Sequence, residues 1–341
     1  MNQPVKHGLD YGGVSATHAW PSSNYCAVAT WNSWLRLYDL GRGEFVQEFN
    51  LPPDMGGMSA AVSHDDRFLY VGTWYAWGLA CVEIATRRFV WKRTDLKRFR
   101  GLCFSPKDDC LYAEFDRAPA MKIDGRTGET VTKLPRVSEV SVSPYGDYLL
   151  TCEPKHLCLR DTSGSVLQKW PREGFAVHRV GWSPRTVAIV ECEDLLTLKE
   201  KFGTRAYDLR TGALLWRLPR KETFPLGIMF RPESEYVAME HNLGADVIVR
   251  LNEQTGAIRR QTVPIANLKC KTCGRGIFRC SVCKGGSLVF AIDQFTHETH
   301  VFPLGDYVED VHEAQPDASR AGGPGSPSGN LRVTEGPPSV S

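Results

Sequence analysis

The sequence predicts an all-β protein, a seven-bladed β-propeller of four-stranded antiparallel blades. Two observations predict this fold. Residues 137–170 can be divided into four short strands separated by turns, and the same pattern of turns returns about every forty residues along the 341-residue chain. Four strands in about forty residues is the period of one propeller blade. Seven such units therefore predict seven blades, and the repeat explains how one domain can be this large.

The unit at residues 137–170 shows the pattern most completely. Its two clearest turns lie at residues 143–147 and 161–164, which are rich in Ser, Pro, Gly and Asp. Short β-rich runs bounded by such residues are typical of strands and hairpins. The apolar runs between the turns are Val140 and Val142, residues 148–150, residues 157–159, and Val166 with Leu167. This unit is therefore predicted to be one four-stranded blade.

Both turns recur along the chain. The second residues of the first turns are Pro21, His64, Pro106, Pro144, Pro184, Pro232 and Lys284. The later turn returns at residues 39–43, 85–88, 124–128, 208–212 and 252–256. The Asp residues that precede these turns, such as Asp161 and Asp208, are expected to bond through their side chains to the turn backbone. The repeats thus predict where each blade begins.

Two of the repeats resemble known propeller families. Residues 206–216, Ala-Tyr-Asp-Leu-Arg-Thr-Gly-Ala-Leu-Leu-Trp, resemble the blade signature of quinoprotein-like propellers. Residues 37–40, Leu-Tyr-Asp-Leu, resemble the third-strand ending of WD repeats. The resemblance covers roughly residues 14–312, but no unit carries the Gly-His dipeptide of well-formed WD repeats, and only residues 206–216 have the full spacing from Thr-Gly to Trp. It therefore implies architecture, while function has to be argued from sites.

The domain organisation follows from the repeat and from composition. Residues 1–13 are expected to form an N-terminal arm or an extra strand, and residues 14–313 the propeller, with a cysteine-containing insertion at 268–286. Residues 306–311 can supply a last strand. Residues 314–341 are rich in Gly, Pro and Ser with hardly any large apolar side chain, so we expect a disordered tail.

Composition limits the classes of partner and the compartment. The formal net charge is +2, which provides no general attraction to nucleic acid or to an anionic membrane. No stretch of eighteen apolar residues and no apolar leader occurs, so a cytoplasmic location is expected. Of the 11 cysteines, seven stand singly in predicted strands, where a free thiol is a small buried hydrophobe. These are Cys26, Cys81, Cys103, Cys110, Cys152, Cys158 and Cys192.

The most specific chemical motif is a pair of Cys-x-x-Cys sequences. Its members are Cys270, Cys273, Cys280 and Cys283. Four thiolates are the ligands that tetrahedral Zn²⁺ prefers in a closed structural site, which leaves no position for a reactive water. The spacing resembles zinc-ribbon knuckles, with a shorter middle. We therefore predict a structural zinc ion, the alternative being two ordinary strand cysteines and an idle loop pair. A redox pair is less favoured because no helix N-terminus is predicted beside it.

Two further groups of side chains are candidates for partner binding. Trp31, Trp34, Trp74 and Trp77 follow the second strands of the first two units. They either form an exposed patch or, as is more common for large aromatics, pack between blades. Acidic residues hold the corresponding region of the later units and form either an attractive rim for a cationic partner or an ordinary solvated rim. They are Glu114, Asp116, Glu153, Glu191, Glu193, Asp194, Glu240 and Asp293.

No catalytic set emerges from the sequence. The nearest motif, His297-Glu298-Thr299-His300, lacks the four-residue helical spacing of metalloprotease histidines. We therefore expect a non-enzymatic interaction scaffold for a protein or peptide partner, with structural Zn²⁺ and with no membrane or nucleic-acid partner. The alternative is a quinoprotein-like oxidoreductase or a hydrolase that holds a ligand in the central channel.

Overall fold

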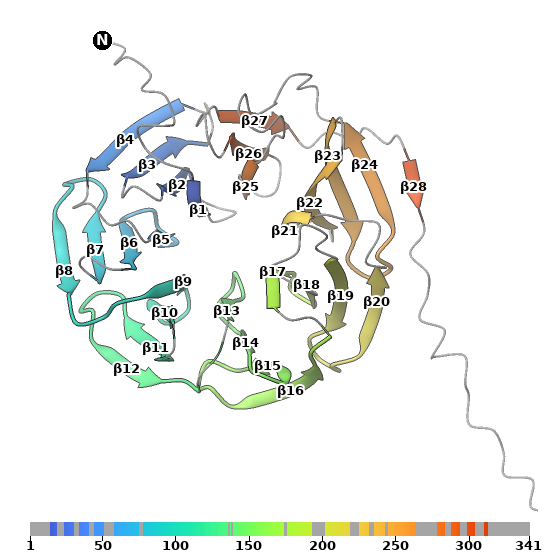
Figure 1. The fold of residues 1–341 in the computed structure, drawn as a ribbon, viewed down its shortest axis with the longest axis horizontal. Helices are drawn as coiled ribbons and strands as arrows, with labels where there is room; N and C mark the ends of the chain where they lie inside the picture. The colour runs from blue at the N-terminus through green and yellow to red at the C-terminus, as the bar shows by residue number, and fades with distance from the viewer. Residues whose placement is uncertain are drawn as a thin grey trace, which may run out of the picture.

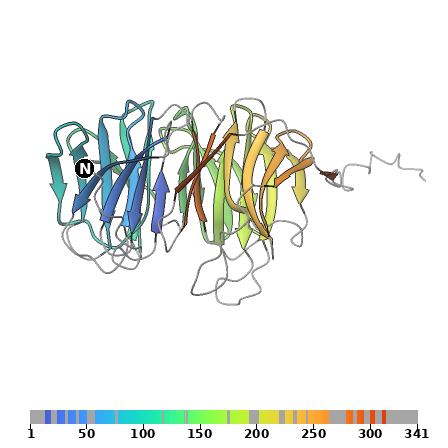
Figure 2. The same ribbon diagram turned by 90° about the horizontal axis from the view of Figure 1, so that it is seen from above.

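A computed structural model describes most of the predicted blades. The described residues are 14–18, 24–30, 34–40, 44–50, 58–74, 78–116, 118–135, 137, 139–173, 176–192, 202–218, 225–231, 235–242, 245–262, 278–283, 288–293, 299–303 and 310–312. They form seven antiparallel sheets around a ring (Figure 1). Seen from the side, the strands run between the two faces of the ring (Figure 2). The predicted all-β propeller is confirmed.

The first four sheets each contain four strands in chain order. The first consists of β1 (Val14–His18), β2 (Tyr25–Thr30), β3 (Trp34–Asp39) and β4 (Glu44–Asn50). The second consists of β5 (Met58–Val62), β6 (Phe68–Thr73), β7 (Leu79–Glu83) and β8 (Phe89–Arg93). The third consists of β9 (Phe99–Ser105), β10 (Cys110–Phe115), β11 (Ala118–Asp124) and β12 (Thr130–Lys133). The fourth consists of β13 (Glu139–Val142), β14 (Leu149–Cys152), β15 (His156–Arg160) and β16 (Val166–Pro171).

The remaining three sheets complete the ring. The fifth consists of β17 (Ala176–Trp182), β18 (Thr186–Cys192), β19 (Phe202–Asp208) and β20 (Leu214–Leu218). The sixth consists of β21 (Pro225–Arg231), β22 (Glu235–Asn242), β23 (Ala245–Asn252) and β24 (Ile258–Thr262). The seventh consists of β25 (Phe278–Cys283), β26 (Leu288–Asp293) and β27 (Thr299–Pro303). β1 lies beside β25, so the first and last sheets meet (Figure 1).

The last strand joins a different blade from the one that precedes it in the chain. β28 (Asp310–His312) pairs with β24, with Ile258 opposite His312. The sixth sheet therefore has five strands, and the seventh has three among the described residues. This pairing covers part of the outer edge of the sixth sheet, which would otherwise present unpaired backbone groups. The predicted arm at residues 1–13 and the predicted tail at 314–341 lie outside the described residues.

The repeated turns have the predicted local chemistry. Ser143 shows the first turn: its amide donates to the Tyr148 carbonyl oxygen at 2.9 Å, and its Oγ accepts from the Tyr148 amide at 3.0 Å. In the later turn, Asp208 Oδ1 accepts from the Thr211 amide at 2.7 Å, and Asp161 Oδ1 accepts from the Ser163 amide at 2.9 Å. The expectation that these aspartates bond to the turn backbone is confirmed.

Tryptophans on outer strands join neighbouring blades. The indole Nε1 of Trp91 donates to the Gly125 carbonyl oxygen at 2.9 Å, and that of Trp170 donates to the Gly212 carbonyl oxygen at 2.9 Å. Trp216 makes the same bond in the next pair of blades. Each indole therefore meets the later turn of the following blade. The Thr-Gly and Trp elements of the signature at residues 206–216 serve two different blade interfaces, which explains why they need not occur together in one unit.

The core explains the isolated cysteines. Six described cysteines are free thiols, of which Cys103 is half-buried and the other five are buried. The predicted role of these six as small buried side chains is confirmed. Cys192 lies in β18, and its side chain is outside the described set. The described part of the chain contains no helix long and apolar enough to cross a membrane.

Candidate functional site

The predicted tryptophan patch is only partly described. Trp34 begins β3 and Trp74 follows β6, and both side chains are half-buried. The connections after β2 and β6 are each closed by a hydrogen bond to a threonine side chain. Thr30 Oγ1 accepts from the Trp34 amide at 3.1 Å, and Thr73 Oγ1 accepts from the Gly78 amide at 3.0 Å. Trp34 and Trp74 therefore stand on corresponding connections of adjacent blades. The other two candidates, Trp31 and Trp77, lie outside the described residues.

Two of the four predicted zinc ligands lie on a described strand, and the other two lie outside the described residues. Cys280 and Cys283 lie on β25, although their side chains are not among those described. Cys270 and Cys273 lie outside the described residues. No group of three or more His, Cys, Asp or Glu side chains arranged to hold a metal occurs in the part of the chain whose side chains are described. His300 lies on β27, whereas His297 is outside the described residues.

The predicted acidic rim is wrong for its two best-described members. Glu114 on β10 and Glu191 on β18 are buried rather than solvated. Glu153 is more exposed, with 22% of its side chain accessible, and its Oε1 lies 2.5 Å from Arg160 Nη2. A buried charge has to be paired or neutralised, because removing it from water is costly. Glu114 and Glu191 therefore lie in the interior of the propeller and not on a solvated rim.

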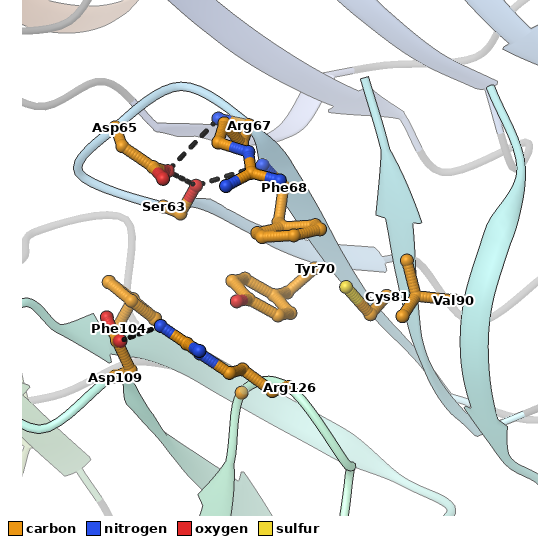
Figure 3. A pocket seen from close by; sticks show the side chains of 11 residues that line it. Ser63, Asp65, Arg67, Phe68, Tyr70, Cys81, Val90, Phe104, Asp109 and Arg126 are labelled. Carbon is orange, nitrogen blue, oxygen red and sulfur yellow. Dashed lines mark hydrogen bonds and ion pairs between the residues drawn. The ribbon is translucent and has the colours of Figure 1, made fainter. Parts of the chain in front are cut away.

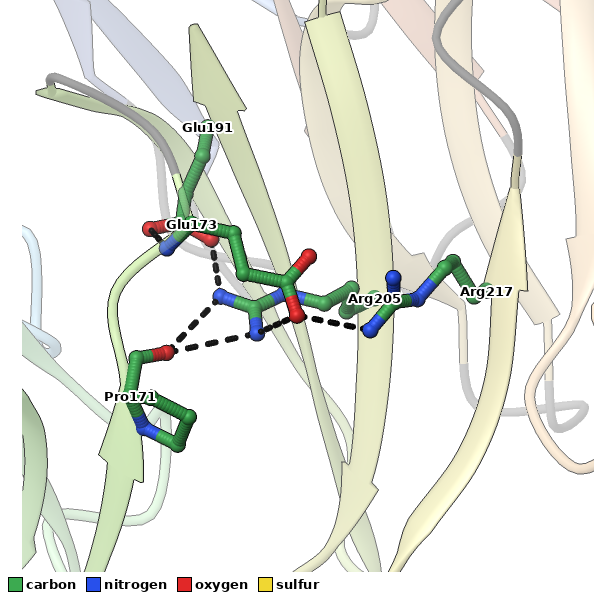
Figure 4. Close-up of polar contacts among 5 residues, drawn as sticks. All are labelled: Pro171, Glu173, Glu191, Arg205 and Arg217. Atoms are coloured by element: carbon green, nitrogen blue, oxygen red, sulfur yellow. Dashed lines mark hydrogen bonds and ion pairs between the residues drawn. The ribbon is translucent and has the colours of Figure 1, made fainter. Parts of the chain in front are cut away.

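Glu191 belongs to a buried ion-pair network in the fifth blade (Figure 4). Its Oε2 contacts Arg205 Nη2, and the two side chains are 4% and 4% exposed. Arg205 Nη1 also contacts Glu173 Oε1 at 3.0 Å, and Arg217 Nη2 contacts the same oxygen at 2.6 Å. Both Nη atoms of Arg205 donate to the Pro171 carbonyl oxygen at 3.3 Å. The network thus ties the end of the fourth blade to the fifth blade.

Glu114 joins the third blade to the fourth. Its carboxyl oxygen accepts a hydrogen bond from the Val140 amide on β13. Burial raises the pKa of Glu114 well above its ordinary value, and the nearby Glu139 carboxylate raises it further. Arg100 lowers the pKa only as the smallest of the contributing causes. Burial therefore favours the protonated form more than it would in an exposed carboxyl group.

A cavity opens on the other face of the ring, between the second and third blades. Its volume is about 220 Å³. The turn between β5 and β6 and the turn between β11 and β12 form its rim, and side chains from β6, β7, β8 and β9 form its walls (Figure 3). The lining residues are Ser63, Asp65, Arg67, Phe68, Tyr70, Cys81, Val90, Phe104, Asp109, Gly125 and Arg126.

Tyr70 is the central polar residue of this cavity. It is 2% exposed, and its ring stacks on Phe104 with the centroids 5.4 Å apart. Its hydroxyl opens onto the cavity and makes no hydrogen bond within the described part of the chain. Burial raises the pKa of Tyr70, and the carboxylates of Asp109 and Asp65 add to that effect. The cavity therefore has aromatic walls and a tyrosine hydroxyl with two carboxylates nearby.

Sequence reasoning missed this cavity for a physical reason. Tyr70 and Phe104 follow the alternating pattern of strand residues, which predicts burial but not the neighbouring blade that each side chain meets. The charged residues of the rim, Asp65 and Asp109, lie in ordinary turn sequences. Only the packing of one blade against the next brings these residues together.

Comparison with known proteins supports the architecture. No protein-family model and no curated protein matches the sequence. Among solved structures, hydrazine synthase from Kuenenia stuttgartiensis has a TM-score of 0.66 and 16% identity, covering 89% of this chain and 99% of that chain. The Pan2 WD40 domain of Neurospora crassa has a TM-score of 0.66 and 14% identity, covering 90% and 94%.

A third similar structure is the Cps50 (Swd1) β-propeller domain of Myceliophteria thermophila. It has a TM-score of 0.65 and 12% identity, covering 86% of this chain and 97% of that chain. At these identities the likeness concerns the fold alone, because one fold can carry many unrelated functions. By its fold, this chain is a β-propeller.

Proposed function

We propose that this protein is a non-enzymatic scaffold that binds a protein or peptide partner. The observation that supports the proposal is the way the blades are joined: indole hydrogen bonds and the Arg205 network connect neighbouring sheets. Connections on such a rigid frame can present side chains in fixed positions, and binding residues occur preferentially on connections of this kind. The single buried thiols support a reducing, cytoplasmic location.

The proposed partner surface is the face that carries the connections between second and third strands. Trp34 and Trp74 lie there on adjacent blades and are half-buried, so part of each indole can meet a partner. Tryptophan supplies a large apolar area and one hydrogen-bond donor, which makes it a frequent anchor in interfaces. Trp31 and Trp77, together with the long connection at residues 193–201 between β18 and β19, belong to the same proposed surface.

Site-specific photo-cross-linking tests this surface. A photoreactive phenylalanine analogue is placed at Trp34, or at Phe45 on outer strand β4 as the matched control. We expect a partner protein to be captured from the Trp34 position and not from the Phe45 position. Binding of that partner should be lost in a Trp34→Ala, Trp74→Ala variant whose melting temperature is unchanged. Cross-links confined to the outer strand would overturn the surface assignment.

We also propose a structural zinc ion bound by Cys270, Cys273, Cys280 and Cys283. β25 pairs with β26 in a regular register up to Cys283 opposite Leu288. Residues three apart on a strand span about 10 Å along it, whereas thiolates of one zinc ion each lie about 2.3 Å from the metal. Binding through both residues therefore requires the end of β25 to turn away from β26 in the zinc-bound protein.

Metal analysis tests the zinc proposal. Protein purified without added metal is analysed by mass spectrometry beside a Cys270→Ser, Cys273→Ser variant. One zinc per chain, lost in this variant together with thermal stability, is expected. Cys103→Ser, which removes a half-buried single thiol, serves as the control and should keep the metal. Absence of zinc from both the wild type and the control would overturn the proposal.

A second candidate function is an oxidoreductase or hydrolase with a ligand in the central channel. The observation that favours it is the likeness to hydrazine synthase, an enzyme by its name, at a TM-score of 0.66. Native mass spectrometry of the purified chain distinguishes the two functions. A bound small molecule that remains after the Trp34→Ala, Trp74→Ala substitutions would favour the channel enzyme.

A further inference from the structure

The cavity between the second and third blades lies on the face opposite the tryptophan connections. Its central polar group is the hydroxyl of Tyr70, a residue that is 2% exposed; this hydroxyl opens onto the cavity and makes no hydrogen bond in the described part of the chain. A hydroxyl that opens onto a cavity and has no protein partner can both donate a hydrogen bond to a ligand and accept one from it. Figure 3 shows this hydroxyl facing the space between the turn that carries Asp65 and the turn before β10 that carries Asp109.

The two carboxylates beside the hydroxyl differ in how they are held. Asp65 Oδ1 accepts from Ser63 Oγ at 2.6 Å and from the Arg67 amide at 3.2 Å, so its position is set by its own turn. Asp109 stands on the third blade and contacts Arg126 Nη2 at 3.3 Å. Carboxylates from two blades therefore flank one hydroxyl, which is an arrangement of acceptors suited to an ammonium group.

The cavity's own cations do not fill this position. The side chain of Arg126 is 79% exposed, so its pair with Asp109 is a surface ion pair and contributes little. Arg67 is also exposed, and its guanidinium lies over the Phe68 ring, 5.2 Å from the ring centroid. Both arginines can reorient at small cost, whereas the buried hydroxyl and the turn-bound carboxylate of Asp65 cannot.

The walls suit the rest of a long side chain. Phe68, Cys81, Val90 and Phe104 line the cavity and offer aromatic or aliphatic surface. The cavity volume of about 220 Å³ is of the order of one large side chain. A lysine combines an aliphatic stem that can lie against apolar walls with a compact ammonium head that has three donors.

We propose that this cavity binds the side chain of a lysine from a protein partner, with the ammonium group donating to the Tyr70 hydroxyl and to the Asp65 and Asp109 carboxylates. The aliphatic stem lies against Val90 and Phe68. The inference rests on the proposed scaffold function and adds a second contact surface, on the face opposite the tryptophans. It specifies a basic segment as the element of the partner that docks here.

Amide NMR spectroscopy tests the proposal with small probes. Labelled full-length protein is titrated with Nα-acetyl-lysine methylamide, and separately with its Nε-acetylated derivative and with Nα-acetyl-norleucine methylamide. We expect saturable shifts at the Tyr70, Cys81 and Gly125 amides with the lysine probe only, and a Kd in the range of about 1 to 10 mM. The two neutral probes have the stem without the charge, so they separate ammonium recognition from simple apolar filling.

Matched variants locate the contact. Tyr70→Phe keeps the ring that stacks on Phe104 and removes only the hydroxyl, so the lysine probe should bind about tenfold more weakly, as expected for loss of one hydrogen bond to a charged group. Tyr112→Phe is the control, because Tyr112 is also buried and does not line the cavity. Asp65→Asn, at an exposed turn position, provides a second variant whose folding does not depend on the core.

Three results would overturn the proposal. They are no saturable shift with the lysine probe, equal binding of the norleucine probe, and unchanged binding in both Tyr70→Phe and Asp65→Asn. None of these results affects the scaffold function itself, because the cross-linking experiment reads the opposite face through Trp34. Conversely, lysine binding here together with no partner captured at Trp34 would move the partner surface to this face.

Discussion

The indole nitrogen of Trp216 donates a hydrogen bond to the carbonyl oxygen of Glu253, 2.8 Å away in the following blade. Trp216 is 1% exposed, so the contact is wholly internal. The indole also faces Gly256, where an added Cβ would lie 2.7 Å from it. A large ring, a buried polar bond and a glycine without a side chain together join the fifth and sixth sheets.

Replacing this tryptophan should measure how strongly adjacent blades are joined. Trp216→Leu loses the hydrogen bond and leaves a cavity, so we expect a loss of about 3 to 5 kcal/mol in the free energy of unfolding. Guanidinium denaturation followed by far-UV circular dichroism checks it. Trp34→Leu, at a half-buried position, should lower the free energy of unfolding by clearly less. Equal losses in the two variants would contradict a special role for the Trp216 contact.

The glycine opposite the indole should be sensitive for two separable reasons. Gly256 has φ +67° and its missing Cβ would lie 2.7 Å from Trp216, whereas Gly164 has φ +92° and its nearest neighbour would be 3.9 Å away. Gly164→Ala should therefore show backbone strain alone, roughly 1 kcal/mol. Gly256→Ala should add the steric clash, at about 1 to 3 kcal/mol more. Thermal unfolding of both variants measures the difference, and similar melting temperatures would argue against close indole packing.

The buried ion-pair network in the fifth blade predicts that removing one carboxylate charge lowers the stability of the protein strongly. Glu191→Gln leaves the buried guanidinium of Arg205 without its closest carboxylate, so about 3 to 5 kcal/mol should be lost. Asp109→Asn breaks a pair with Arg126 that is far more exposed and should change stability by about 1 kcal/mol or less. Urea denaturation compares the two. A small effect of Glu191→Gln would mean that Glu173 alone neutralises Arg205.

Glu114 predicts a pH dependence of a definite sign. Burial raises its pKa in the folded state above the ordinary value of 4.5. Its contribution to stability is therefore fully present below about pH 4.5 and is lost as the pH rises towards the folded-state pKa, by about 1.4 kcal/mol per pH unit. Glu114→Gln keeps a neutral side chain and should flatten this decline. Melting temperatures measured from strongly acid to mildly alkaline pH test this prediction.

Asp208 is a control for that experiment because its pKa is shifted in the opposite direction, so its effect on stability changes with pH in the opposite sense. Hydrogen bonds from the Thr211 amide and side chain hold the pKa of this carboxyl below its ordinary value of 3.8. Its contribution is present above that value and is lost as the pH falls through the lower folded-state pKa. Asp208→Asn should therefore change the acid side of the profile only. If the decline in stability above pH 4.5 is unchanged in Glu114→Gln, groups other than Glu114 cause it.

The candidate sites show the limit of pattern reading. The acidic positions Glu114 and Glu191 follow apolar strands in the sequence and were expected at a rim, yet both are buried. A period of two residues tells which side chains share a face of one sheet. It does not tell how far the adjacent blade covers the end of that sheet, so exposure at strand ends could not be predicted.

The sequence by itself determined the fold, because short-range chemistry sets both the strand alternation and the turns. Ser143 and Asp208 make their predicted kind of turn within a few residues of themselves. Only the tertiary structure decided how the blades meet: the bond from Trp216 to Glu253, the five-stranded sixth sheet and the cavity around Tyr70. These contacts join residues from different strands or blades, and their partners depend on the geometry of the closed ring rather than on any local pattern.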